Sequence, residues 1–228
     1  MSSPIKLAEI GNIVGDPARA AMLCALLDGR SHSATELSLA ARVSRPTASW
    51  HLAKLADGQL VTAEKRGRSR HFQLASSLVA QALEAMMTLT ASRAPRPLVL
   101  SRHERALRHA RTCYDHFAGR LGVALTEALA QRKLILVSDD GGVMTRQGQR
   151  VLAAFGVDLS AAQRSRRAFC RPCLDWSEQR PHLAGAIGAA LARRCFDLDW
   201  VRRLPDTRAV AITPDGVIGF EEQFGIIA

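Results

Sequence analysis

The sequence predicts a mainly α fold with short β-hairpins, of class α+β, in two parts. Helical patterns bounded by capping residues fill much of the first ninety residues, and an alternating stretch on either side of Gly67 predicts a hairpin. Beyond residue 100, a phrase with Arg, Cys, Asp, His and two glycines occurs twice. The composition, 47% apolar and 23% charged, is typical of a globular protein.

The charge balance indicates a polyanionic partner. The chain carries 31 Lys and Arg against 21 Asp and Glu, a net charge of +10, and phosphates attract such a surface. Its apolar stretches are shorter than the roughly 18 to 20 residues that a membrane helix needs, and the first residues resemble no signal peptide. Five cysteines at scattered positions fit no disulfide framework. We therefore expect a cytoplasmic protein with reduced thiols and no membrane partner.

The first predicted helix follows Asp16. This residue is a suitable N-cap, Pro17 suits the first helical position, and Gly29 marks the end. Cys24 lies in the apolar run of this helix, so we expect it to be a small core residue.

Two short helices follow between residues 33 and 57, joined by only a few residues. Ser33 or Thr35 caps the first helix and Ser44 caps the second. Apolar residues fall where a helix-turn-helix needs inward contacts: Leu37, Ala40, Val43, Ala48, Leu52 and Leu55. The residues left for DNA are Ser44, Arg45, Thr47, Ser49, Trp50 and Lys54.

A basic hairpin comes next. The stretch LVTAEKRGRSRHFQLA alternates apolar and polar residues, and its tip carries Lys65, Arg66, Arg68 and Arg70. An isolated basic hairpin is usually just solvated. After a helix-turn-helix, however, such a tip favours contact with DNA phosphates.

These residues resemble the winged-helix repressors of the arsenical-resistance (ArsR-type) family. The resemblance covers GDPARAAMLCALLDG, ATELSLAARVSRPTASWHLAKLADGQLV and EKRGRSRHF. It implies a homodimer on double-stranded, pseudo-palindromic operator DNA, with Arg45, Thr47 and Ser49 reading bases. Trp50 stands where many relatives carry a polar residue. The metal sites of many relatives are missing, because TELSLAA lacks cysteine and SSLVAQALEAMMTLTASR lacks histidine.

The DNA-binding part is expected to end near Ser92, because RAPRPL cannot continue a helix. We predict a DNA-binding and dimerisation domain at 1–92, a linker at 93–98 and a sensor domain at 99–228. Met86, Met87 and Leu89 offer either an apolar dimer face or an intrachain core.

The C-terminal half predicts two pseudo-symmetric helix-hairpin units, covering roughly 101–157 and 163–228. RTCYDHFAGRLGVAL is repeated as RPCLD and HLAGAIGAAL, and both units later contain Thr-x-x-Gly. Glycine costs helix stability, so the paired glycines at 119 and 122 and at 185 and 188 indicate close packing of equivalent helices across the pseudo-twofold axis.

The repeated phrases place chemistry-bearing side chains in both units. If the units meet near their helix starts, Cys113, His116, Cys173 and His182 form a tetrahedral set for zinc or another thiophilic ion. Asp115 and Asp175 would be further ligands or would hold the histidines. The Cys-to-His interval is three residues in one unit and nine in the other, and buried cysteines beside hydrogen-bonded histidines are the structural alternative.

Two other effector chemistries compete. Cys170 and Cys173 form CRPC, and the flanking Arg167 and Arg171 would lower a thiol pKa and favour redox or thiophile sensing. An organic effector would instead bind near aromatic side chains: Tyr114, Phe117, Phe169 and Trp176.

The combined reading is a dimeric transcriptional repressor whose operator affinity responds to a metal, thiol-reactive or organic effector. An enzyme using Cys113, Asp115 and His116, or Cys173, Asp175 and His182, is an alternative. A C-terminal half acting only in dimerisation is a third.

Overall fold

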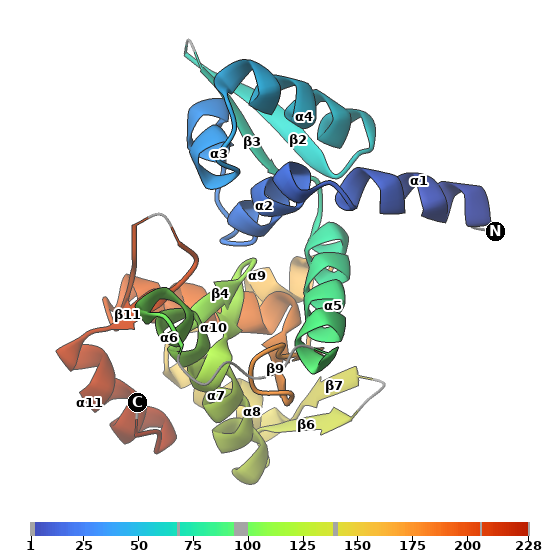
Figure 1. Cartoon of the computed structure of the whole chain (residues 1–228). Coiled ribbons are helices and arrows are strands. Elements are labelled where there is room, and N and C mark those ends of the chain that lie inside the picture. The colour runs from blue at the N-terminus through green and yellow to red at the C-terminus, as the bar shows by residue number, and fades with distance from the viewer. Residues whose placement is uncertain (1–2, 68, 94–99, 139–140, 206, 228) are drawn as a thin grey trace. The chain divides into compact units, whose positions relative to one another are not determined.

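The computed structural model describes residues 3–67, 69–93, 100–138, 141–205 and 207–227 (Figure 1). The chain forms two compact units, Met1–Leu83 and Glu84–Ala228. Within the described ranges, no helix is long and apolar enough to cross a membrane.

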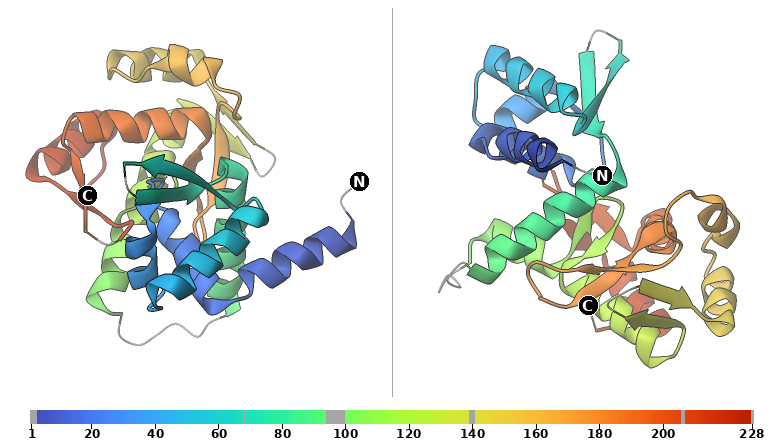
Figure 2. Two further views of the ribbon diagram at one scale, coloured as in Figure 1. Left: turned by 90° about the horizontal axis from the view of Figure 1, so that it is seen from above. Right: turned by 90° about the vertical axis from the view of Figure 1, so that its right-hand side faces the viewer.

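The first unit consists of four helices, a three-stranded sheet and the start of a fifth helix. Its elements are α1 (Pro4–Val14), α2 (Pro17–Leu26), β1 (His32–Ser33), α3 (Ala34–Ala40), α4 (Arg45–Asp57), β2 (Val61–Arg66), β3 (Ser69–Leu74) and α5 (Ser77–Arg93). The antiparallel sheet has the order β1-β3-β2, and the long β2–β3 hairpin is visible in both views of Figure 2.

Short polar side chains cap the helices of this unit at the predicted places. Asp16 accepts a hydrogen bond from the Arg19 backbone N–H, and Ser44 accepts one from that of Thr47. Ser33 forms a capping box with Glu36. This order of helices, turn and hairpin is a winged helix-turn-helix, as the sequence predicts.

The core of the first unit corrects several predictions. Leu37, Ala48, Leu52 and Leu55 are buried as expected, but Ala40 is exposed and Val43 is only half-buried. Cys24 is also exposed, because the neighbouring Met22, Leu23 and Leu26 occupy the inward face of α2. His51 was not expected in the core, yet it is buried with its Nδ1 3.5 Å from Arg19 Nη1.

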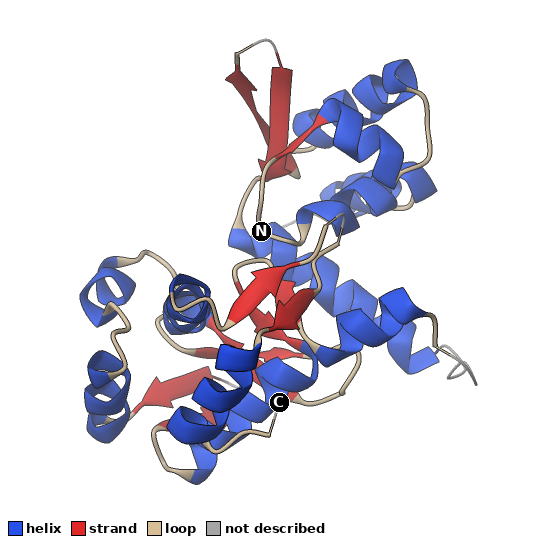
Figure 3. Cartoon of the chain, turned by 90° about the vertical axis from the view of Figure 1, so that its left-hand side faces the viewer, coloured by secondary structure: helices blue, strands red, loops and turns tan. Residues whose placement is uncertain are grey.

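The second unit contains the predicted duplication. The first copy runs α6 (Arg102–His109), β4 (Arg111–Cys113), β5 (His116–Ala118), α7 (Gly119–Gln131), β6 (Ile135–Ser138), β7 (Gly141–Met144) and α8 (Arg146–Ala154). The second runs α9 (Leu159–Arg164), β8 (Arg171–Leu174), β9 (Pro181–Ala184), α10 (Gly185–Asp197), β10 (Val201–Arg203), β11 (Val210–Ile212) and α11 (Pro214–Phe224). Each copy is therefore helix, hairpin, helix, hairpin, helix, with the short strands drawn red in Figure 3.

The repeated Thr-x-x-Gly phrases begin the last helix of each copy. Thr145 accepts a hydrogen bond from Gly148 N and Thr213 accepts one from Gly216 N, both at 3.0 Å. A Cβ atom at Gly148 would overlap the carbonyl oxygen of Leu134. The phrase therefore combines an N-cap with a close approach of helix and backbone.

The paired glycines pack differently from the prediction. Gly119 and Gly185 have φ values of 72° and 83°, which suit glycine where each hairpin turns into a helix. Cβ atoms at Gly122 and Gly188 would overlap the backbone of their own hairpins. These Cβ atoms would also lie 3.4 Å from His182 Cβ and 3.3 Å from His116 Cβ, each in the other copy. The close approach is thus between helix and hairpin rather than between equivalent helices.

The division between the units lies within α5, upstream of the predicted boundary at 92. A buried ion pair explains this, because Glu84 on α5 contacts the Arg208 guanidinium in the second unit. Residues 94–98 of the predicted linker lie outside the described residues.

Candidate functional site

Helix α4 presents the polar face expected of a recognition helix. Its DNA-binding candidates Ser44, Arg45, Thr47, Ser49, Trp50 and Lys54 are all exposed, while Ala48, Leu52 and Leu55 point into the core. Trp50 is 56% exposed and its ring lies 5.9 Å from Lys54 Nζ. A large exposed aromatic ring is suited to packing on a sugar or on a neighbouring side chain.

The hydroxyl groups at the start of α4 already form hydrogen bonds at the helix cap. Ser44 Oγ lies 2.7 Å from Thr47 Oγ1 and accepts from the Thr47 backbone N–H at 3.3 Å. Their first role is to hold the helix start, so Arg45 and Ser49 are left as the more available polar side chains.

The hairpin β2–β3 carries the predicted basic tip, and Lys65, Arg66 and Arg70 are exposed. Arg68, a further candidate, lies outside the described residues. Arg66 pairs with Glu64 at 3.0 Å, a partner that the sequence analysis missed although the two residues are on the same face of β2. This ion pair offsets part of the charge that Arg66 would offer to a phosphate.

Four side chains of the repeated phrases meet inside the second unit. One ligand atom from each of Cys113, His116, Cys173 and His182 lies within 4.8 Å of all the others. Cys113 Sγ and Cys173 Sγ are 4.0 Å apart, and His116 Nε2 and His182 Nε2 are 3.2 Å apart. All four residues are buried. The structure thus brings together the four side chains that the sequence singled out.

Strand register explains why unequal Cys-to-His intervals give equal geometry. Cys113 lies directly opposite His116 in the β4–β5 hairpin, and Cys173 lies directly opposite His182 in β8–β9. Residues directly opposite in an antiparallel pair project from the same face. The longer second interval adds only to the loop beyond Leu174, so it leaves the pairing unchanged.

A carboxylate stands behind each imidazole. Asp115 Oδ1 lies 3.4 Å from His116 Nδ1, and Asp175 Oδ2 lies 3.3 Å from His182 Nδ1. Asp175 also pairs with the buried Arg111 at 2.9 Å. Asp115 pairs with Arg167, whose Nη2 is 3.2 Å from Asp115 Oδ1. Neither carboxylate is among the four converging groups, but each lies close to the Nδ1 atom of one histidine.

Comparisons with known proteins show the family. A helix-turn-helix domain family model matches residues 14–64. The chain is 38% identical over 220 residues to the uncharacterized HTH-type transcriptional regulator YdfF of Bacillus subtilis (strain 168), covering 96% of this chain and 97% of that relative. This chain belongs to the HTH-type transcriptional regulators.

Similar solved structures cover the N-terminal part of the regulator. Reduced HlyU from Vibrio cholerae is 29% identical and covers 37% of this chain and 88% of its own, with a TM-score of 0.35. The homodimeric winged helix-turn-helix domain of Mb0332 from Mycobacterium bovis, a possible ArsR-family regulator, is 21% identical, covers 42% and 89%, and has a TM-score of 0.37. The ArsR-type resemblance seen in the sequence agrees with the family assignment.

Neighbouring groups shift the pKa values of Cys113, Cys173 and His182 in the regulator. A hydrogen bond from Cys113 lowers the pKa of Cys173 far below its usual value, whereas the same bond raises that of Cys113. Burial opposes charge on His182, but Asp175 and Cys173 outweigh it and raise the pKa of His182 to about 9. The arrangement therefore favours a thiolate beside an imidazolium.

The other C-terminal cysteines lie apart from the cluster. Cys170 packs in the large hydrophobic core, and burial raises the pKa of its thiol to about 11. This shift is opposite to the one expected from the flanking arginines, because burial disfavours the charged thiolate. Burial also raises the pKa of Cys195 to about 12. Cys170 is thus a poor thiolate for redox sensing.

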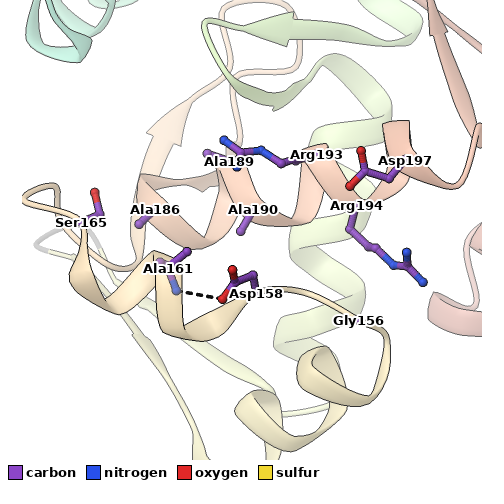
Figure 4. Close-up of a pocket in the computed structure, with 11 residues that line it drawn as sticks. Gly156, Asp158, Ala161, Ser165, Ala186, Ala189, Ala190, Arg193, Arg194 and Asp197 are labelled. Carbon is purple, nitrogen blue, oxygen red and sulfur yellow. Dashed lines mark hydrogen bonds between the residues drawn. The ribbon is translucent and has the colours of Figure 1, made fainter.

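The aromatic side chains proposed for an organic effector serve other contacts. Phe117 and Phe169 pack in or against the hydrophobic core, and the Trp176 ring lies 4.5 Å from the Arg111 guanidinium. Tyr114 is half-buried in the β4–β5 turn. The pocket in Figure 4 lies between α9 and α10, where alanines from both helices and the charged Asp158, Arg193, Arg194 and Asp197 line it. None of the four aromatic candidates lines this pocket.

Proposed function

We propose that this regulator is a homodimeric repressor that binds a pseudo-palindromic operator in double-stranded DNA. The observation that supports this most directly is that Arg45 and Ser49 of α4 are exposed, while Ala48 and Leu52 of the same helix are buried in the core. Such a helix suits the major groove, and the basic β2–β3 tip suits the flanking phosphates. The overall charge of +10 favours the same partner.

Exposed apolar side chains support a second copy of this chain as partner. Helix α1 has no buried residue, and its Ile5 and Leu7 are 71% and 74% exposed. On α5, Leu78 is 72% exposed. Met86 is also exposed, whereas Met87 contacts the Arg208 guanidinium within the second unit. These exposed apolar side chains on α1 and α5 are the candidates for the dimer contact.

Helix α5 is the element through which the C-terminal unit would act. The helix begins in the first unit and is held in the second by the buried Glu84–Arg208 ion pair. The backbone oxygen of Arg208 accepts a hydrogen bond from Thr112 N at 2.9 Å, and Thr112 adjoins Cys113. A ligand that binds one arrangement of this network better shifts the population of DNA-binding dimers.

Arg45 provides the first test of operator binding. Binding sites are selected from a random-sequence duplex library and measured by fluorescence anisotropy. Arg45→Ala should cost about 1 to 3 kcal/mol and relax the preferred sequence, because a guanidinium paired with guanine reads a base. Lys65→Ala should weaken all sequences alike and reduce the salt slope by about one unit.

Arg146→Ala is the matched control. Arg146 is exposed on α8 in the second unit, so its loss changes net charge equally without touching the proposed DNA face. Equal losses in all three variants would mean that only net charge matters. Unchanged binding for Arg45→Ala and Lys65→Ala would refute the proposed interface.

The burial of the Cys/His cluster argues against the enzyme alternative. His182 is 0% exposed and Cys113 is 2% exposed, so a substrate has no direct access to either nucleophile or base. A purely dimerising C-terminal half would need neither of these groups.

A further inference from the structure

We propose that Cys113, His116, Cys173 and His182 bind one zinc ion per chain in a closed tetrahedral site. This inference goes beyond operator binding and does not depend on it. The four residues come from equivalent places in two copies of the same motif, so the metal would lie on the pseudo-twofold axis of the duplication and join its halves.

The measured separations match the edges of a zinc tetrahedron. With Zn–S near 2.3 Å and Zn–N near 2.0 to 2.1 Å, tetrahedral angles place two sulfurs about 3.8 Å apart and two nitrogens about 3.3 Å apart. The observed separations are 4.0 Å between the sulfurs and 3.2 Å between the Nε2 atoms. All remaining pairs fall within 4.8 Å. An ideal sulfur-to-nitrogen edge is about 3.6 Å, so side-chain shifts of up to about 1 Å would complete the shell.

Strand pairing fixes which ligands lie side by side. Each hairpin pairs one cysteine with one histidine across the strands. A Cβ atom at Gly122 or Gly188 would overlap the backbone of its own hairpin and would lie 3.4 or 3.3 Å from the Cβ of His182 or His116. The repeated glycines thus let each helix pack closely on the hairpin that carries the ligands.

The two Nε2 atoms at the centre of the cluster are also placed to share a metal ion. If both imidazoles direct Nδ1–H at Asp115 and Asp175, their Nε2 lone pairs face each other at 3.2 Å in a buried site. Facing lone pairs repel, so the arrangement needs a further proton or a metal ion. Zinc uses both lone pairs at once and leaves the Nδ1–H groups to the carboxylates, as in carboxylate–histidine–zinc triads.

The ligand types select the metal and its role. Two thiolates and two imidazoles in a tetrahedral set favour zinc over magnesium or calcium, which prefer oxygen. Four protein ligands leave no open position for water. The site is therefore suited to a structural or regulatory ion and not to hydrolysis.

A short series of contacts links the proposed zinc site to α5. Cys113 follows Thr112, which donates to Arg208 O, and the Arg208 side chain contacts Glu84. If the proposed operator binding holds, zinc occupancy should change DNA affinity through this contact. Zinc binding itself is tested separately.

The test measures zinc on untagged full-length protein, purified under reducing conditions from zinc-supplied cells. Elemental analysis should give one zinc per chain. After chelation, titration with Co²⁺ should produce the visible bands of tetrahedral cobalt together with thiolate-to-cobalt charge transfer, saturating at one equivalent. Cys173→Ser should abolish the charge-transfer intensity of one thiolate and weaken binding.

Two further variants keep the test decisive if Cys173→Ser folds poorly. Asp115→Asn replaces the half-buried carboxylate behind His116, which also pairs with Arg167, and should weaken zinc binding about 10- to 100-fold in competition with a chelator. Cys24→Ser removes an exposed thiol of the first unit and should leave affinity unchanged. Zinc-free wild-type protein that gives no tetrahedral cobalt spectrum would overturn the proposal, as would full affinity in Cys173→Ser.

Discussion

The two aspartates of the repeated phrase should differ sharply in what they contribute to stability. Asp175 is 0% exposed. Its Oδ2 accepts from Arg111 Nη2 at 2.9 Å and from Gly119 N at 2.6 Å, while its Oδ1 accepts from Ser177 N at 2.9 Å. Asp115 occupies the equivalent place, but its side chain and that of its partner Arg167 are both 30% exposed.

Asp175→Asn should cost about 3 to 5 kcal/mol, because it leaves the buried Arg111 guanidinium without a counter-charge. It also turns an amide donor toward groups that already donate. Asp115→Asn should cost no more than about 1 kcal/mol, because water reaches both partners of its ion pair. The two positions are equivalent in the repeated motif, so a difference in stability loss between the two variants measures the effect of burial.

Urea unfolding followed by tryptophan fluorescence measures this difference. The chain has three tryptophans, at 50, 176 and 200, so a Trp50→Phe background restricts the signal to the second unit. The expected loss for Asp175→Asn corresponds to a fall in Tm of about 6 to 20 °C, from about 2 to 4 °C per kcal/mol. Equal costs at the two positions, or a cost below about 1 kcal/mol at Asp175, would refute the reasoning.

Three further predictions concern other parts of the chain. Gly148→Ala should destabilise the second unit by about 1 to 3 kcal/mol through overlap with Leu134; thermal melts should show Gly141→Ala, with open space around its Cβ, near wild type. Burial raises the pKa of Asp28, but His32 and Arg30 outweigh it and leave it lowered. Ionised Asp28 therefore stabilises the first unit above about pH 3.9, and this stabilisation is lost as the pH falls through the pKa of Asp28 in the folded protein. When unfolding is followed by Trp50 fluorescence, the stability of Asp28→Asn should fall less steeply at acid pH than that of wild type. An equally steep fall would contradict this. Chelation of the proposed zinc should lower the melting temperature of the second unit alone; equal shifts in both units would count against that placement.

The local structure and the duplication could be predicted from the sequence alone. Caps such as Asp16 and Ser44, the apolar spacing of Leu52 and Leu55, and the alternation around Gly67 act over a few residues, so they are legible without tertiary information. The repeated phrase also pointed to the two cysteines and two histidines that converge in the structure.

The burial of single side chains and the contacts between residues far apart in the chain depend on tertiary packing, so the sequence did not reveal them. Whether Cys24 is buried depends on which face of α2 meets α3 and α4, and periodicity leaves that face ambiguous at a single position. The Glu84–Arg208 pair joins residues far apart in the chain, and no local pattern predicts it. The convergence of Cys113, His116, Cys173 and His182 depends on strand register, because only cross-strand pairing makes intervals of different length equivalent.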